Sequence, residues 1–290
     1  MIVDAHLHVW DPSRAPYPWL TADLHPLDRA LLIDDIAADL DRAGVARVVL
    51  VQAADNADDT AVMRVEAARH PDRVAAIVGW LPLDDPDAVE EGLAVFTEDP
   101  LLVGVRNLIH EREPGWLSQP AQSAALGLLA EAGLSLDFVT GSADALAEIP
   151  EILERHPTLR IVIDHLGKPP IGGSPSDRAT WRELLAEAAA HPLVHAKVSG
   201  LYPPVGDARA WDVDDVRPFI EDAAELFGAG RLMYGSDWPI VERAGGHGRV
   251  HGALLEILDG WGASERAAVL SGTATRFYRF SRIPLERTTA

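Results

Sequence analysis

The sequence begins with MIVDAHLHVW, residues 1–10, and this stretch is predicted to form the first strand of a parallel barrel. Ile2 and Val3 favour a strand, in which alternate side chains point to the same side. His6 and His8 therefore share a face, with Asp4 below them. With 11 histidines in 290 residues, such a pair arises by chance roughly 0.4 times, so the pair needs support from the rest of the chain.

Short β-branched runs alternate with amphipathic segments along the whole sequence. The predicted strands are Ile2–Ala5, Arg47–Gln52, Val74–Trp80, Val103–Asn107, Leu134–Val139, Arg160–Asp164, Val194–Ser199 and Arg231–Gly235. The predicted helices are Leu32–Ala43, Thr60–His70, Asp87–Phe96, Gln122–Ala132, Asp144–His156, Ala179–His191 and Asp215–Phe227. Eight strands with intervening helices match the (β/α)8, or TIM, barrel. We therefore predict one α/β barrel domain over residues 1–290, with an open doubly wound sheet as the alternative.

Composition excludes several classes of partner. The formal net charge of −20 leaves no basic face for a nucleic acid backbone, and no apolar run is long enough to span a membrane. The chain has no cysteine, which excludes disulfides, thiolate metal sites and a cysteine nucleophile. A small molecule is the expected partner and the cytoplasm the expected location, while the oligomeric state is left open.

In a TIM barrel the chemistry lies where the strands end, so these positions were searched for reactive groups. Because strand eight closes against strand one, Asp237 is predicted to stand beside His6 and His8, with His165 on the same rim. The strand-end groups are His6 and His8; Arg106 and Asn107 in GVRN; Asp164, His165 and Lys168 in DHLGKP; Lys197 and Ser199 in KVSG; and Ser236 and Asp237 in GSDWP.

Each group also has a structural explanation. His165 alone fits a hydrogen-bonded structural histidine, and Gly-Ser-Asp-Trp-Pro fits a tight turn. Lys168 either orients a substrate or reaches the surface, whereas Arg106 needs an anionic or polar partner. Reactive residues occur together at several predicted strand ends, and this favours a shared site. The pair His247 and His251 has helical metal-ligand spacing but no nearby acid, and we interpret it as a solvated helix start.

Several motifs in order resemble one family. DAHLHVWDP, YPWL, GVRN, DHLGKP, KVSGLY and GSDWP are similar to the metal-optional lactonase branch of the amidohydrolase superfamily, which includes L-fuconolactonase, L-rhamnonolactonase-like proteins and 2-pyrone-4,6-dicarboxylate lactonase. The resemblance implies a TIM barrel that hydrolyses lactones in carbohydrate catabolism. It also implies that His6, His8 and His165 surround the scissile carbonyl and that Asp237 is the base. Relatives often have His at the position of Asn107.

Lactone hydrolysis requires a base for water, a polarised carbonyl and a proton for the leaving oxygen. Asp237 is the natural base, and the imidazoles face the carbonyl oxygen directly or through a cation. Trp238 and Trp10 are expected to keep the pocket dry. The predicted substrate-binding residues are Arg106, Asn107, Lys168 and Trp238.

A binuclear site would need a bridging Lys or Glu at the end of the fourth strand, where this chain has Asn107, and a His after the fifth, where it has LDFVTG. We therefore predict one zinc or manganese ion, or none. Its ligands would be His6 and His8, with His165 or Asp237.

Three functions are compatible with this set of residues. The first is hydrolysis of a sugar aldono-1,4-lactone, similar to L-fuconolactone. The second is metal-dependent decarboxylation of an unsaturated or aromatic acid, and the third is carbohydrate binding without catalysis. A pyrone dicarboxylate would call for several arginines, whereas the rim offers Arg106, so a neutral hydroxylated lactone fits better.

Overall fold

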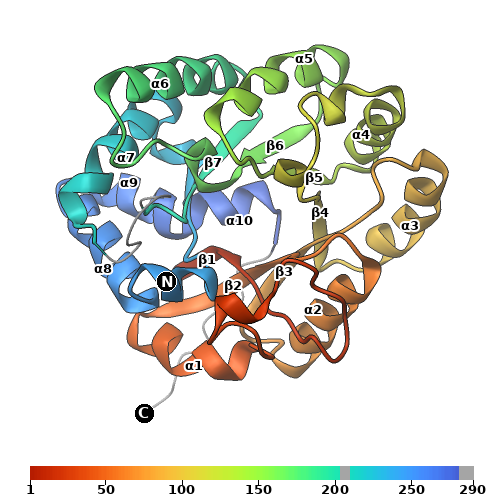
Figure 1. The fold of residues 1–290 in the computed structure, drawn as a ribbon, viewed down its shortest axis with the longest axis horizontal. Coiled ribbons are helices and arrows are strands. Elements are labelled where there is room, and N and C mark those ends of the chain that lie inside the picture. The colour runs from red at the N-terminus through yellow and green to blue at the C-terminus, as the bar shows by residue number, and fades with distance from the viewer. Residues whose placement is uncertain (203–209, 281–290) are drawn as a thin grey trace.

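The computed structural model describes residues 1–202 and 210–280. Eight strands follow one another around the molecule in chain order, each parallel to the next (Figure 1). Their bounds are β1 Ile2–Leu7, β2 Val45–Val51, β3 Val74–Gly79, β4 Leu102–Arg106, β5 Ser135–Phe138, β6 Arg160–Ile163, β7 Val194–Val198 and β8 Leu232–Tyr234. Every strand overlaps the one predicted from the sequence.

A helix follows each strand and packs on the outside of the barrel (Figure 1). Side-chain oxygens of Asn56, Asp85, Ser174 and Asp212 accept hydrogen bonds from the free amides at helix starts. The helices are α1 Ile33–Arg42, α2 Ala57–Arg69, α3 Pro86–Glu98, α4 Pro120–Ala132, α5 Glu148–Arg155, α6 Pro175–Ala189, α7 Val213–Phe227 and α8 His247–Leu258, followed by α9 Ala263–Ala267 and α10 Thr273–Phe277. Within the described residues, no helix has the length and apolar character needed to cross a membrane.

The barrel closes between β1 and the segment after β8. The amide of Asp237 donates to the carbonyl of His6, and the amide of His8 donates to the carbonyl of Trp238, both at 2.8 Å. Below them, Asp4 Oδ1 accepts from the amide of Ser236 at 2.9 Å. The predicted parallel closure is thus confirmed, although the contact forms just beyond residues 231–235, at Leu7 and Trp238. These bonds hold Asp237 beside the two histidines.

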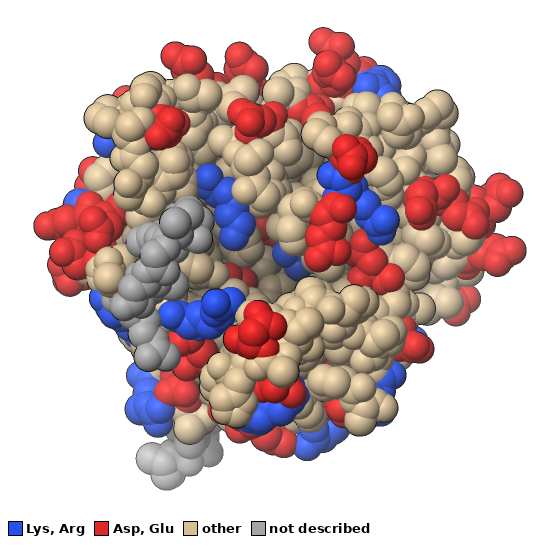
Figure 2. All heavy atoms as spheres, viewed as in Figure 1, with Lys and Arg blue, Asp and Glu red and all other residues tan. Residues whose placement is uncertain are grey.

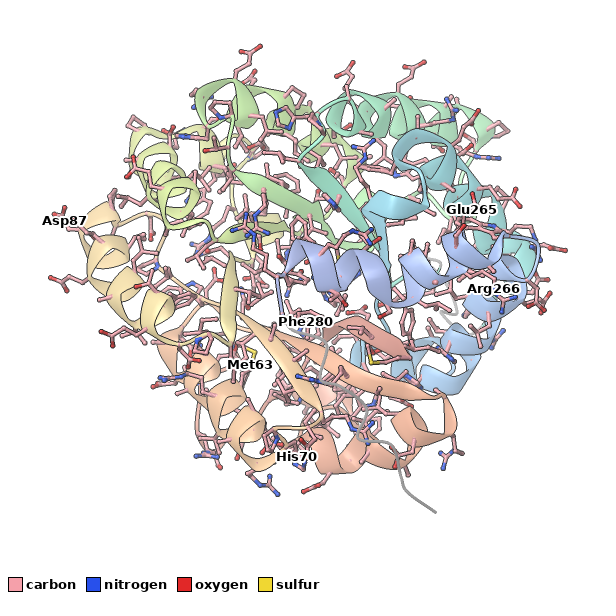
Figure 3. The ribbon with its side chains drawn as sticks, turned by 180° about the vertical axis from the view of Figure 1, so that it is seen from behind. Met63, His70, Asp87, Glu265, Arg266 and Phe280 are labelled. Atoms are coloured by element: carbon pink, nitrogen blue, oxygen red, sulfur yellow. The ribbon has the colours of Figure 1, made fainter. Side chains whose placement is uncertain are left out.

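The amino-terminal end of the barrel is filled, and the carboxyl-terminal end holds the cavity. Inward-facing residues such as Val3, Val49 and Met233 form a core cluster with Phe277 and Tyr278 of the C-terminal segment. Seen from behind, the C-terminal helices lie across this end of the barrel (Figure 3). A larger apolar cluster fills the space between the strands and the helices. The only strand ends left for chemistry are therefore those at the opposite rim.

Asp59 on α2 makes the free energy of unfolding depend on pH. It is buried and accepts hydrogen bonds from the Tyr17 hydroxyl at 2.8 Å and the Ala53 amide at 2.9 Å. Burial raises the pKa of Asp59 from 3.8 to about 6. Because the folded state holds this proton more tightly than the unfolded chain, stability is full below about pH 4 and falls as the pH rises through 6.

We expect Asp59→Asn to reduce this loss of stability between pH 4 and pH 7 by about 2–3 kcal/mol, since one pKa unit corresponds to about 1.4 kcal/mol. Urea unfolding at several pH values measures it. Asp58→Asn, at an exposed position on the same helix, is the control. An unchanged pH dependence in Asp59→Asn would contradict the assignment.

Candidate active site

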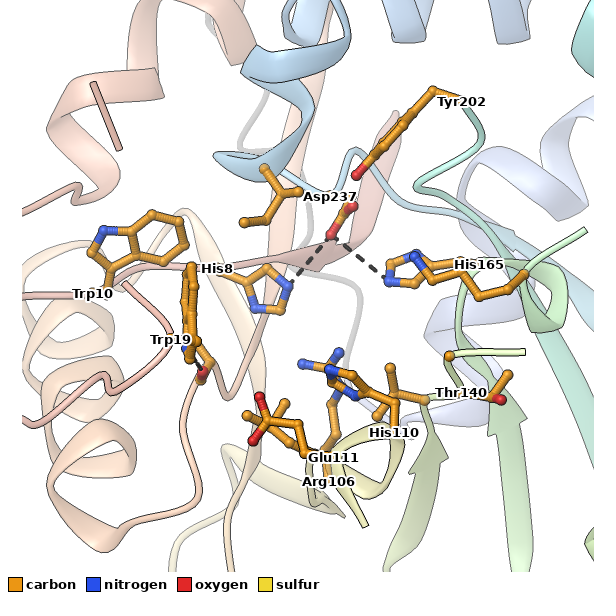
Figure 4. A pocket seen from close by; sticks show the side chains of 16 residues that line it. His8, Trp10, Trp19, Arg106, His110, Glu111, Thr140, His165, Tyr202 and Asp237 are labelled. Carbon is orange, nitrogen blue, oxygen red and sulfur yellow. Dashed lines mark hydrogen bonds and ion pairs between the residues drawn. The ribbon is translucent and has the colours of Figure 1, made fainter. Parts of the chain in front are cut away.

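The structure brings together four side chains from three strand ends. His6 lies on β1 and His8 directly follows it, His165 follows β6 and Asp237 follows β8. Figure 4 shows His8, His165 and Asp237 of this set. Asp237 Oδ1 lies 3.6 Å from His6 Nε2, 3.5 Å from His8 Nε2 and 3.9 Å from His165 Nε2. The Nε2 atoms of His6 and His8 are 3.1 Å apart. All four residues are buried, so their polar atoms converge on one small space.

Backbone strain is concentrated at this site. Among the described non-glycine residues, five have positive φ angles, and four of them are His165, Leu166, Lys168 and Asp237, at 54°, 51°, 57° and 61°. Such conformations cost on the order of 1–3 kcal/mol each and persist where the surrounding structure imposes them. Gly200 lies so close that a Cβ atom there would be 2.5 Å from His165 Nδ1. The surrounding structure therefore holds these residues in strained backbone conformations, and these conformations set the direction of their side chains.

Hydrogen bonds to the far sides of two imidazoles orient them. His8 Nδ1 lies 2.8 Å from the carbonyl oxygen of Val51. Because a carbonyl only accepts, this nitrogen carries the proton in neutral His8, and Nε2 offers a lone pair to the site. His165 Nδ1 lies 2.9 Å from the Ser199 hydroxyl, which can donate to it and leave the proton on Nε2.

The charge state of the site follows from its burial. Desolvation lowers the pKa of His6 and of His165 well below 6.5, so both rings are neutral near pH 7. Desolvation alone would raise the pKa of Asp237, but His165, His8 and Lys168 outweigh it and hold this pKa below 3.8. The site thus contains an ionised carboxylate beside the neutral imidazoles of His6 and His165.

Four buried charges lie behind His6. Lys197 Nζ is 2.5 Å from Asp137 Oδ2 and 3.1 Å from Asp164 Oδ1, while Arg106 Nε is 2.9 Å from Asp164 Oδ2. Burial raises the pKa of Asp137, whereas for Asp164 the neighbouring Lys197 and Arg106 outweigh burial and hold the pKa well below 3.8. Sequence reasoning identified Lys197 and Asp164 as strand-end groups but missed Asp137, because Leu134–Val139 reads as an apolar strand with one acid.

A cavity of about 250 Å³ opens above His8, His165 and Asp237, whereas His6 is fully buried behind them and does not line it (Figure 4). Figure 2 shows this face of the molecule, with a central hollow and basic side chains at its rim. Two predicted substrate-binding residues, Arg106 and Lys168, line it. Its lining consists of His8, Trp10, Trp19, Ala53, Arg106, Leu108, His110, Glu111, Val139, Thr140, Gly141, His165, Lys168, Tyr202, Asp237 and Ile240.

Two other predicted substrate-binding residues are not among the described residues that line this cavity. Asn107 is buried and its side-chain amide donates to the carbonyl of Leu81 at 3.1 Å. Trp238 belongs to the apolar core beside β1. Trp10 does line the cavity, together with Trp19, which lies in YPWL and to which no role was assigned. Tyr202 in KVSGLY was missed in the same way.

The four convergent residues suit a divalent cation. His6, His165 and Asp237 offer ligand atoms that all lie within 4.8 Å of one another. The separations of 3.1, 3.5 and 3.6 Å among His6 Nε2, His8 Nε2 and Asp237 Oδ1 are close to the edge of about 3.4 Å in a tetrahedral zinc site with bonds of about 2.05 Å. In the described part of the chain, His6, His165 and Asp237 form the only group of three or more such ligands.

The pair on α8 differs from the prediction. His247 and His251 are buried, not solvated, and their rings stack in parallel with centroids 5.8 Å apart. His247 Nε2 lies 3.4 Å from the hydroxyl of Tyr234 on β8. The start of α8 packs against the barrel, which the helical spacing alone did not reveal.

Comparison with known proteins agrees with the fold. The amidohydrolase family model matches residues 3–280. The chain is 34% identical to an L-fucono-1,5-lactonase from Burkholderia ambifaria, covering 97% of this chain and 96% of the relative, and 30% identical to an L-fucono-1,5-lactonase from Burkholderia multivorans, covering 95% of each. A crystal structure of a Burkholderia multivorans amidohydrolase with bound zinc superposes with a TM-score of 0.88 at 28% identity, covering 97% of this chain and all of that one.

Proposed function

The chain belongs to the amidohydrolase family, and on that premise we propose that it is a lactonase that opens a sugar aldonolactone by attack of water activated by Asp237. The observation that carries the proposal is the ionised Asp237 beside the neutral imidazoles of His6 and His165, at the floor of the cavity. The curated relatives named L-fucono-1,5-lactonase support the substrate class.

Asp237 is suited to remove a proton from water. Its carboxylate remains charged at neutral pH because neighbouring groups hold its pKa low, and it is fixed by the backbone bonds to β1. A carboxylate of low basicity acts best on a water that is polarised as it attacks. The convergent nitrogen atoms within 4 Å provide that environment.

The imidazoles complete the reaction. With Ser199 donating to His165 Nδ1, the Nε2 proton of His165 faces the cavity and can stabilise the oxyanion that forms as water adds to the carbonyl. As this intermediate collapses, the ring C–O bond breaks and the leaving ring oxygen takes the proton that Asp237 removed from water. The product is a hydroxy acid, whose carboxyl group then releases one proton to solvent. If a zinc or manganese ion binds to His6, His8 and Asp237, with His165 nearby, it supplies Lewis-acid polarisation of the carbonyl.

The cavity walls favour a neutral hydroxylated substrate. Trp10 and Trp19 meet edge to face at 5.2 Å and form an apolar wall suited to the carbon face of a sugar. Arg106 is already committed, since it pairs with Asp164 and donates to the carbonyl of Gln52 at 2.7 Å. An anion clamp for a dicarboxylate pyrone or a decarboxylase substrate would need uncommitted cations, and Lys168 offers one.

A pH-indicator assay over aldono-1,4- and 1,5-lactones and a pyrone dicarboxylate, with metal analysis of the same sample, tests the proposal. We expect proton release with deoxysugar lactones such as L-fuconolactone, and little or none with the dicarboxylate. Failure to open any lactone, with or without added zinc or manganese, would refute it. Bicarbonate release from an aromatic acid would favour the decarboxylase.

A further inference from the structure

One proton in the site has two possible positions. His6 Nδ1 lies 3.0 Å from Lys197 Nζ and 3.2 Å from Asp164 Oδ1. Lys197 can only donate and the Asp164 carboxylate can only accept, so the two contacts are mutually exclusive as hydrogen bonds. A neutral imidazole carries one ring proton, so the choice between the two contacts decides which nitrogen of His6 holds it.

Without a cation, each hydrogen-bond donor in this part of the site has an acceptor when Lys197 donates to His6 Nδ1. The His6 proton then lies on Nε2 and is donated across 3.1 Å to His8 Nε2, which has a lone pair because His8 Nδ1 donates to Val51. Lys197 is fully buried and held by Asp137, which also accepts from the Tyr278 hydroxyl at 2.7 Å. Every contact in this chain of groups has one donor and one acceptor.

A cation at the site requires the other tautomer. His6 must then present the Nε2 lone pair, which places its proton on Nδ1 for donation to Asp164. A carboxylate behind an imidazole ligand strengthens it, whereas a cation there weakens it. Lys197 therefore opposes cation binding in two ways. It occupies His6 Nδ1, and it also contacts the Asp164 oxygen that would accept the His6 proton.

We propose that Lys197 is a positioning residue that stabilises the metal-free form of the site and weakens its affinity for zinc by holding His6 in the Nε2–H tautomer. The proposal rests on the proposed function only in taking the four convergent residues as the cation site. Lys197 touches neither substrate nor cation and acts through His6.

Zinc affinity of the folded variants, measured by competition with a chromogenic chelator in the absence of substrate, tests the proposal. Lys197→Met should bind zinc more tightly than the wild type, on the order of 10-fold or more. Asp137→Asn keeps the lysine and leaves Asp164 as its remaining carboxylate, so it should bind zinc several-fold more weakly. If Lys197 had a merely structural role, both variants would shift the zinc affinity in the same direction. Either that shared direction or an unchanged zinc affinity in Lys197→Met would overturn the proposal.

A second measurement needs no variant. Nitrogen-15 NMR of the imidazoles in the zinc-free wild-type protein should show His6 protonated on Nε2, and zinc should move the proton to Nδ1. A zinc-free spectrum with the proton on Nδ1 would overturn the proposal even if Lys197→Met fails to fold. Neither readout uses a lactone, so failure of the lactonase assay would leave the result intact.

Discussion

Asp237→Asn should lower kcat for lactone hydrolysis by roughly 10²–10⁴-fold, the range attributed to general acid–base catalysis. The substitution preserves the size of the side chain and much of its hydrogen bonding but removes the basic carboxylate. The bonds that place residue 237 beside β1 come from backbone atoms, so the fold should remain intact. Steady-state kinetics on the best lactone, with circular dichroism of the same sample, measures both effects.

The matched control is Asp214→Asn. The side chain of Asp214 lies on α7, is 88% exposed and is not part of the cavity lining. It should retain wild-type kcat. Near wild-type turnover in Asp237→Asn on every lactone that the native protein opens would contradict the mechanism.

The pH profile gives a separate test of the base. Only the carboxylate form of Asp237 accepts a proton, so kcat/KM should rise as the pH passes its pKa and stay level through neutrality. Since this pKa is held below 3.8, the rising limb should lie in the acid range, and it should vanish in the Asn variant. A rising limb that persists in the Asn variant would instead indicate that another group is the base.

His165→Asn should lower kcat by roughly 10²–10³-fold if its Nε2 proton stabilises the oxyanion. The ring is buried, neutral and held at Nδ1 by Ser199, so no other described group has the same proton in the same place. KM should change much less than kcat, because the interaction strengthens as the oxyanion forms. Initial-rate kinetics over a range of substrate concentrations separates the two parameters.

The control for this variant should be exposed. His247 is unsuitable, because it is buried against β8 and its loss would affect stability. His25, whose side chain is 80% exposed, is the better choice, and His25→Asn should match the wild type. An equal loss of kcat in both variants would show that the effect is not specific to the site.

Local sequence patterns were sufficient to predict the eight strands, the seven helices α1 to α7 and the four convergent residues, whereas no ranges were predicted for α8, α9 and α10. Strand and helix periods are read over a few neighbouring residues, and a parallel barrel collects all strand ends at one rim. His6, His8, His165 and Asp237 therefore could be assigned to one place before any contact was known. The parallel closure of the barrel followed from the same reasoning.

Side-chain direction and distant contacts were decided by the tertiary structure. Asn107 and Trp238 lie at the expected strand ends, yet one side chain turns to the Leu81 carbonyl and the other packs into the core. His247 is buried because Tyr234 of β8 packs against α8. A rim position in the sequence does not specify which way its side chain points.

The charges behind His6 show most clearly which features the sequence determined and which the tertiary structure decided. The sequence by itself determined that Lys197 and Asp164 end neighbouring strands. Only the folded barrel brings Asp137 to Lys197, across 60 residues of chain, and Tyr278 to Asp137, across 141 residues. A buried charge is tolerable only where its partners are within hydrogen-bonding distance. Those partners are supplied by closure of the barrel and by the C-terminal segment that fills its base, so the position of the His6 proton is a property of the tertiary structure.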